Sequence, residues 1–154
     1  MKAYVLAGVL LLAGIQVGMA ADTPPPRVID MTVVLKDPQG KPIIDQLEGK
    51  ADATKPGGID CSACGNLTVG HAIANALFAN LPSETNAQGV SSVSPEQKWA
   101  RGALAERIKD DKTATLTASE IVVVKKLVGQ VYGTNVIMQI FPLLDPSDKP
   151  PPLQ

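Results

Sequence analysis

The chain has 154 residues, of which 45% are apolar and 3% aromatic, enough for one modest hydrophobic core and so for a single domain. Its 14 Lys and Arg against 15 Asp and Glu give a net charge of −1. This balance lacks the basic excess that binding to a nucleic-acid backbone requires, so nucleic acid is not an expected partner. The 13 prolines and 13 glycines indicate that much of the chain is turn, loop or tail.

Residues 1–20 have the pattern of a secretory signal peptide. Lys2 precedes an apolar run, and small residues precede Ala21, which is typical of a segment that is cleaved on export. We therefore expect an exported protein, periplasmic or secreted, with no stable membrane insertion after cleavage. Two alternatives are an uncleaved membrane anchor made of the same run and a true start at Met31, which would leave the protein in the cytoplasm.

A proline-rich leader over 21–27 comes before the first expected strand. Over 28–35 the apolar residues alternate with the others, and a period of two is typical of a half-buried strand. The sequence DPQG at 37–40 has the residue order of a type I turn. A short strand over 41–45 would complete a β-hairpin spanning 28–45.

Residues 46–66 have no sustained apolar periodicity and are expected to form a long surface loop that carries both cysteines. The part over 67–145 is expected to be helical. Apolar residues recur there at three- and four-residue steps, between signals for helix starts and stops. These signals predict helices over about 69–81, 95–109, 118–132 and 134–144, the last one bent or broken near Pro142.

The predicted fold class is α+β, mostly α, with an N-terminal β-hairpin followed by about four short helices. The domain spans 28–145, and a proline-rich tail covers 146–154. We expect the second helix to bury one side, made of Trp99, Ala103, Leu104 and Ile108. We expect the third helix to bury Ile121, Val124, Leu127, Val128 and Val131.

Cys61 and Cys64 are expected to form a structural disulfide within the loop. A redox-active pair is an alternative, although no strand pattern leads into the motif and the expected helix N-cap, Thr68, lies four residues beyond Cys64. Zn²⁺ bound by Cys61, Cys64 and His71 is a weaker alternative, because a closed structural zinc site needs four ligands. Free thiols would follow from a reducing compartment.

His71 is the only histidine, and we interpret it as a hydrogen-bonded or surface residue of the first helix rather than as a catalytic base. The sequence contains no GxSxG, no HExxH, no P-loop and no dinucleotide-binding motif after a strand. We therefore predict no catalytic residue and no cofactor, and we do not expect an enzyme.

The last helix is apolar at nearly every position over 136–141, so it must be buried on all sides or contact a partner. The candidate residues for contact with a partner protein are Val136, Ile137, Ile140 and Phe141.

Three segments in this order, DPQGKPI, LTVGHAIANALF and LTASEIVVVKKLVGQVYG, resemble a group of small proteins of unknown function encoded in tailed phages and prophages. The resemblance covers about 31–145 and implies no activity and no site residue. The chain differs from the group in its signal-like leader and in the segment GGIDCSACGN.

The expected function is that of a small exported non-enzymatic protein that binds another protein through its helical surface. One alternative is a periplasmic thiol-redox or metal-binding accessory protein that uses Cys61, Cys64 and possibly His71. A second alternative, which follows from a start at Met31, is a cytoplasmic phage-type assembly or host-interaction factor.

Overall fold

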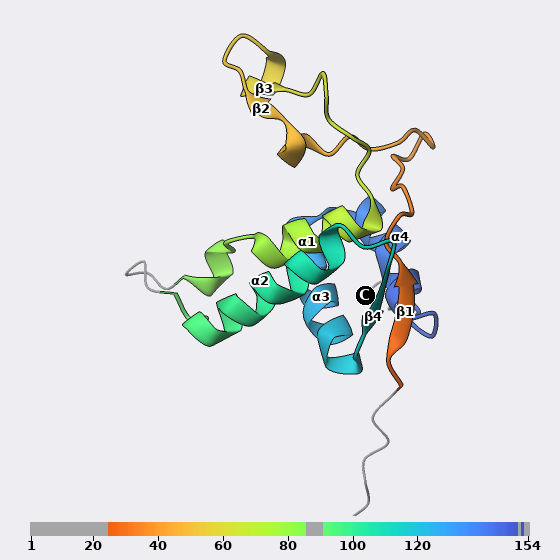
Figure 1. Cartoon of the computed structure of the whole chain (residues 1–154). Coiled ribbons are helices and arrows are strands. Elements are labelled where there is room, and N and C mark those ends of the chain that lie inside the picture. The colour runs from red at the N-terminus through yellow and green to blue at the C-terminus, as the bar shows by residue number, and fades with distance from the viewer. Residues whose placement is uncertain (1–24, 86–90, 151, 153–154) are drawn as a thin grey trace, which may run out of the picture.

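A computed structural model describes residues 25–85, 91–150 and 152, so the predicted signal peptide lies outside the described residues. The fold is α+β and mostly helical, as predicted (Figure 1). The helices are α1 Val69–Phe78, α2 Pro95–Lys109, α3 Ala118–Val131 and α4 Thr134–Leu144. The strands are β1 Arg27–Asp30, β2 Lys50–Ala51, β3 Ile59–Asp60 and β4 Thr113–Leu116. Short 3₁₀ turns are η1 Gln46–Glu48, η2 Pro56–Gly58 and η3 Pro82–Glu84.

The helices begin at the predicted caps. Ser94 accepts a hydrogen bond from the backbone N–H of Gln97 at 3.2 Å, and the Gln97 side chain accepts one from the Ser94 N–H. Thr117 and Glu120 form the same reciprocal pair at the start of α3. Each box satisfies two amides that a helix start leaves without partners. The caps thus fix where α2 and α3 begin.

The last helix was expected to be bent or broken near Pro142; α4 continues through Pro142 to Leu144, so the break is wrong. Pro142 lies in the last turn, where the missing N–H removes only one hydrogen bond and little helix follows. Among the described residues, none of the helices combines the length and the apolar character needed to cross a membrane.

Strand β1 pairs with β4, in an antiparallel register that places Ile29 opposite Ala114 (Figure 1). Strand β4 was not expected from the sequence, where this segment precedes the third helix. The predicted turn at 37–40 does form, with the Gly40 N–H donating to Asp37 O at 2.9 Å and Gly40 at a φ of 81°. The expected second strand over 41–45, however, contributes only isolated bridges, between Pro42 and Lys36 and between Ile44 and Asn66. Proline has no N–H for a ladder.

One hydrophobic core joins the strands and helices. Its contacts are densest between α1 and α2, between α1 and α3, and between β1 and β4. Fully buried side chains with the largest volumes are Met31, Leu35, Ile73, Ile108, Leu116, Leu127, Ile140, Leu144, Val69, Val124 and Val128.

The expected burial of Trp99 is wrong, because 78% of this residue is exposed. Each residue advances an α-helix by about 100°, so Trp99 lies on the opposite side of α2 from Ile108. Ala103 and Val131 are also exposed. The buried side of α2 consists of Leu104, Ala105 and Ile108.

Residues 46–64 form an arm that projects from the helical body beyond α1 (Figure 1). The arm contains η1, β2, η2 and β3, and the two strands pair only with each other. None of the arm's described side chains is buried. Polar contacts such as that of Glu48 with the Gly65 N–H, rather than hydrophobic packing, therefore hold the arm against the body, and the cysteine pair closes a small ring within the arm.

Candidate functional site

The two cysteines lie at disulfide distance in the arm. Their sulfur atoms lie within bonding distance, and their Cα atoms are 4.7 Å apart. The short strand β3 ends at Asp60, directly before Cys61, so a strand does lead into the motif, contrary to the sequence-based interpretation. Helix α1 begins only at Val69, which leaves the cysteines away from the helix N-terminus that lowers a thiol pKa in redox-active pairs.

His71 lies in the first turn of α1 and faces two carboxylates rather than the cysteines. Its Nδ1 is 3.1 Å from Asp45 Oδ2 and 3.5 Å from Glu48 Oε1. Among the described residues, the three side chains Asp45, Glu48 and His71 form the only such group of potential metal ligands. The structure therefore does not bring His71 into one ligand set with Cys61 and Cys64.

Sequence reasoning missed Asp45 and Glu48. Neither belongs to a motif with His71, and the contact spans 26 residues between Asp45 and His71. The burial of Asp45, which is 3% exposed, comes from the fold and has no local signature. Burial raises the pKa of the nearby Tyr132 hydroxyl above its ordinary value, and the negative charge of Asp45 adds to this rise.

Two of the four partner-contact candidates on α4 are buried within the domain. Val136 is 7% exposed and Ile140 is fully buried. Ile137 and Phe141 are partly buried and pack against the core. The exposed apolar residues of α4 are Met138 and Leu143 instead. The apolar run of this helix is thus explained mainly by packing on α3 and β1.

A groove with a volume of about 630 Å³ lies between α2, α3 and the segments around η3 and Ser92. Leu104 and Leu127, both buried, lie at the base of the groove, and the half-exposed Val123 adds further apolar surface. Polar side chains also line the groove, among them Ser83, Glu84, Ser92, Gln97, Arg101, Ser119, Glu120, Lys126 and Gln130. The α2–α3 groove therefore combines an apolar base with charged and hydrogen-bonding walls.

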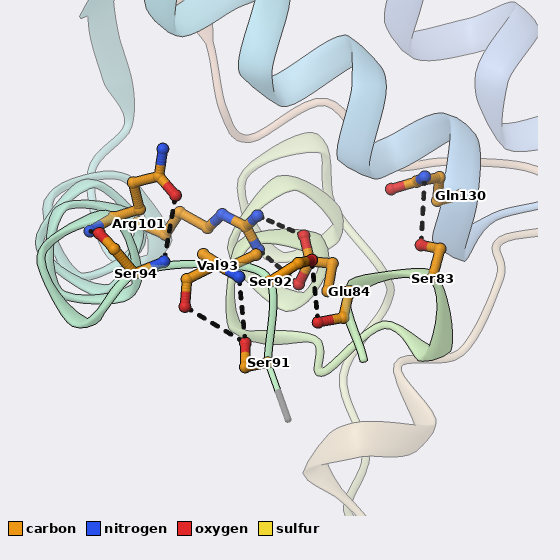
Figure 2. Close-up of polar contacts among 9 residues, drawn as sticks. Ser83, Glu84, Ser91, Ser92, Val93, Ser94, Arg101 and Gln130 are labelled. Carbon is orange, nitrogen blue, oxygen red and sulfur yellow. Dashed lines mark hydrogen bonds and ion pairs between the residues drawn. The ribbon is translucent and has the colours of Figure 1, made fainter. Parts of the chain in front are cut away.

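An ion pair between Arg101 and Glu84 forms one wall of the groove (Figure 2). Arg101 Nη1 donates to Glu84 Oε2 at 3.0 Å, and Nη2 donates to Oε1. The two side chains are only 16% and 14% exposed. Hydrogen bonding by Arg101 holds the pKa of Glu84 below its ordinary value, although burial opposes this shift.

The backbone around this pair is fixed as well. Figure 2 shows that the Glu84 carbonyl lies next to Ser92, which donates to it from N at 2.7 Å and from Oγ at 3.1 Å. Gln130 on α3 donates to Ser83 Oγ at 3.5 Å. The wall formed by η3 is thus tied to both α2 and α3.

The charged side chains that line the groove differ in whether they form ion pairs. Glu84 is paired with Arg101, and Glu120 is paired with Arg107 and with the cap of α3. Within the described part of the chain, Lys126 makes no ion pair. A ligand in the groove would therefore meet one cation, Lys126, that forms no ion pair with a carboxylate of the described chain, although its charge acts on Glu84.

Comparison with protein-family models, curated proteins and solved structures gives no match. The residues of the chain alone therefore carry the functional assignment. The α2–α3 groove was not predicted, because its lining residues are spread over 83–130 and come together only when α2 and α3 both pack on α1.

Proposed function

We propose that this protein is an exported, non-enzymatic accessory protein that binds a partner by taking a peptide segment into the α2–α3 groove. The segment carries an apolar side chain for the base and an adjacent carboxylate for Lys126. The observation that carries this proposal is the groove itself, with Leu104, Leu127 and Val123 below and Lys126 on the wall.

The apolar base supplies the affinity. Val123 is 39% exposed although it is apolar, and covering such surface is favourable by about 25 cal/mol per Å². Ligand sites of proteins commonly combine an apolar lining with a few convergent polar groups that fix orientation. The groove has this composition.

The walls support binding because they are already ordered. The Arg101–Glu84 pair and the Ser92 hydrogen bonds hold the η3 side of the groove in place. A preformed site avoids the cost of ordering side chains when the ligand binds. The charge of Lys126 then selects for an acidic neighbour of the anchoring side chain.

Two further features support export. The sequence over 1–20 has the pattern of a signal peptide, and the cysteines lie at bonding distance in the arm. Structural disulfides persist in oxidising compartments such as the periplasm and the extracellular space. We propose that the protein acts in such a compartment.

Selection of a random peptide library displayed on phage against the immobilised full chain tests the proposal. We expect enriched peptides to share an apolar residue next to Asp or Glu. Synthetic copies should bind Val123→Glu and Lys126→Glu at least ~10-fold more weakly than the unmodified chain. The matched control is Val122→Glu, since Val122 is more exposed than Val123 but does not line the groove.

Three outcomes would contradict the proposal. The first is the absence of any enriched peptide, and the second is an equal loss of binding for Val122→Glu and Val123→Glu. The third is sedimentation of the unmodified chain as a dimer that Val123→Glu dissociates, because the groove would then be occupied by a second copy.

A further inference from the structure

The cluster of Asp45, Glu48 and His71 lies where the arm leaves the helical body. Asp45 immediately precedes η1, Glu48 ends η1, and His71 belongs to α1. Asp45 is the one charged residue that is buried among the described residues. Burying a carboxylate is costly unless a cation or several hydrogen bonds compensate it.

Each carboxylate has one oxygen held by the backbone and the other directed at His71. Asp45 Oδ1 accepts from the Leu47 N–H at 3.2 Å, and Glu48 Oε2 accepts from the Gly65 N–H at 2.8 Å. The remaining oxygens, Asp45 Oδ2 and Glu48 Oε1, both approach Nδ1 of His71. Such outer hydrogen bonds are the usual means of orienting metal ligands.

A proton on Nδ1 of His71 serves only one of these oxygens well. The contact to Asp45 Oδ2 at 3.1 Å has hydrogen-bond length, whereas Glu48 Oε1 at 3.5 Å is too far for a good hydrogen bond. Two negative charges thus converge on one nitrogen. A divalent cation at this point would neutralise both carboxylates and bind all three atoms.

The spacing of the three atoms suits a tetrahedral ion. With bonds of about 2.0–2.2 Å to nitrogen and carboxylate oxygen, the edges of a Zn²⁺ tetrahedron are about 3.3–3.6 Å long. The observed separations from Nδ1 are 3.1 and 3.5 Å, and all three potential ligand atoms lie within 4.8 Å of one another. Only small side-chain adjustments are needed to surround the ion.

We propose that Asp45, Glu48 and His71 bind a divalent transition-metal ion, Zn²⁺ in the first instance, with water in the fourth position. Imidazole nitrogen and carboxylate oxygen are both established Zn²⁺ ligands. The ion joins the arm to α1. The arm's own described side chains are not buried, so hydrophobic packing does not otherwise attach it to the body. The site is separate from the cysteines and from the α2–α3 groove.

Isothermal titration with Zn²⁺ tests the site on the full chain, without an affinity tag and with the disulfide intact. We expect one ion per chain and at least ~10-fold weaker binding for Glu48→Gln, which keeps an oxygen for the Gly65 N–H but loses the charge. Asp111→Asn, an exposed carboxylate outside the cluster, is the control and should bind as the unmodified chain does.

A second measurement uses the fact that His71 is the only histidine. Zn²⁺ should shift the NMR signals of this one imidazole and slow tryptic cleavage after Lys50, which is exposed in the arm. His71→Asn should abolish the slower cleavage. The proposal is overturned by no Zn²⁺ binding, by equal binding to Glu48→Gln and the unmodified chain, or by binding only after reduction, which would assign the ion to the cysteines.

Discussion

Arg101 on α2 donates from both terminal nitrogens to the two carboxylate oxygens of Glu84 in η3. A planar guanidinium fits a carboxylate in this two-point arrangement better than an ammonium does. Both side chains are mostly buried, and the low dielectric there strengthens the attraction between their charges. Burying either charge without its partner would be costly. The pair sets the position of η3 against α2 and therefore the width of the groove.

The Arg101–Glu84 pair should make stability depend on pH in acid. The pKa of Glu84 lies below its ordinary value of 4.5, so the folded chain takes up this proton less readily than the unfolded chain. The contribution is then fully present above the ordinary pKa and is lost as pH falls through the folded-state pKa. Glu84→Gln should lower the free energy of unfolding at pH 7 by about 2 kcal/mol and flatten its decline in acid.

Urea denaturation at a series of pH values measures this effect. The control is Glu106→Gln, because Glu106 forms an exposed ion pair with Lys109 on the same helix, and exposed pairs add little to stability. A pH profile of Glu84→Gln that parallels the unmodified chain would contradict the prediction.

Gly70 and Gly102 both lie within helices but should respond in opposite ways to alanine. A Cβ at Gly70 would lie 3.0 Å from Met31 Cβ and 3.2 Å from Ile108 O, whereas one at Gly102 would meet nothing within 4 Å. We expect Gly70→Ala to destabilise the fold by about 1–3 kcal/mol through overpacking. Gly102→Ala should stabilise it by about 0.5–1 kcal/mol, since alanine favours a helix over glycine. Thermal and urea unfolding measure the stability of both variants. An equal change in stability for the two would be inconsistent with the close approach at Gly70.

Side-chain truncations on the buried and the exposed side of α4 should differ in their effect on stability. Ile140→Ala removes a fully buried side chain and should cost about 2–5 kcal/mol of unfolding free energy. Met138→Ala, on the exposed side, should change it by less than about 0.5 kcal/mol. Chemical denaturation compares the two. A larger loss for Met138→Ala would show that α4 packs with its other side.

Breaking the cysteine pair should loosen the arm and leave the helical body nearly unchanged. The arm buries no described side chain, so its local opening is not coupled to the core. In Cys61→Ser with Cys64→Ser, trypsin should cut faster after Lys50, while the melting temperature changes little. Cleavage after Arg107 in α2 is the internal control, and a large drop in melting temperature would contradict the prediction.

Local features were predictable from the sequence, and contacts between distant segments were not. Ser94 and Thr117 each mark a helix start through residues three positions away, so their caps could be recognised directly. Strand β4 has only four residues, and its partner β1 lies near the start of the described chain. The Asp45–His71 contact and the groove depend on the same long-range packing.

Trp99 illustrates a different limit. This aromatic side chain was expected on the buried side of the second helix, although its helical position relative to Ile108 places it on the other side of α2. Exposure of the only tryptophan means that its fluorescence should resemble that of a solvated indole, and burial by type alone is a weak guide for aromatic residues.

The pairing of β1 with β4 joins the beginning of the described chain to a segment that is synthesised much later. Closing so long a loop is entropically costly and slow compared with forming the helices. A nascent chain that ends before Thr113 therefore carries β1 as an open strand edge, the kind of edge on which chains associate wrongly. Strand β1 can therefore find its partner only after Thr113–Leu116 has been synthesised.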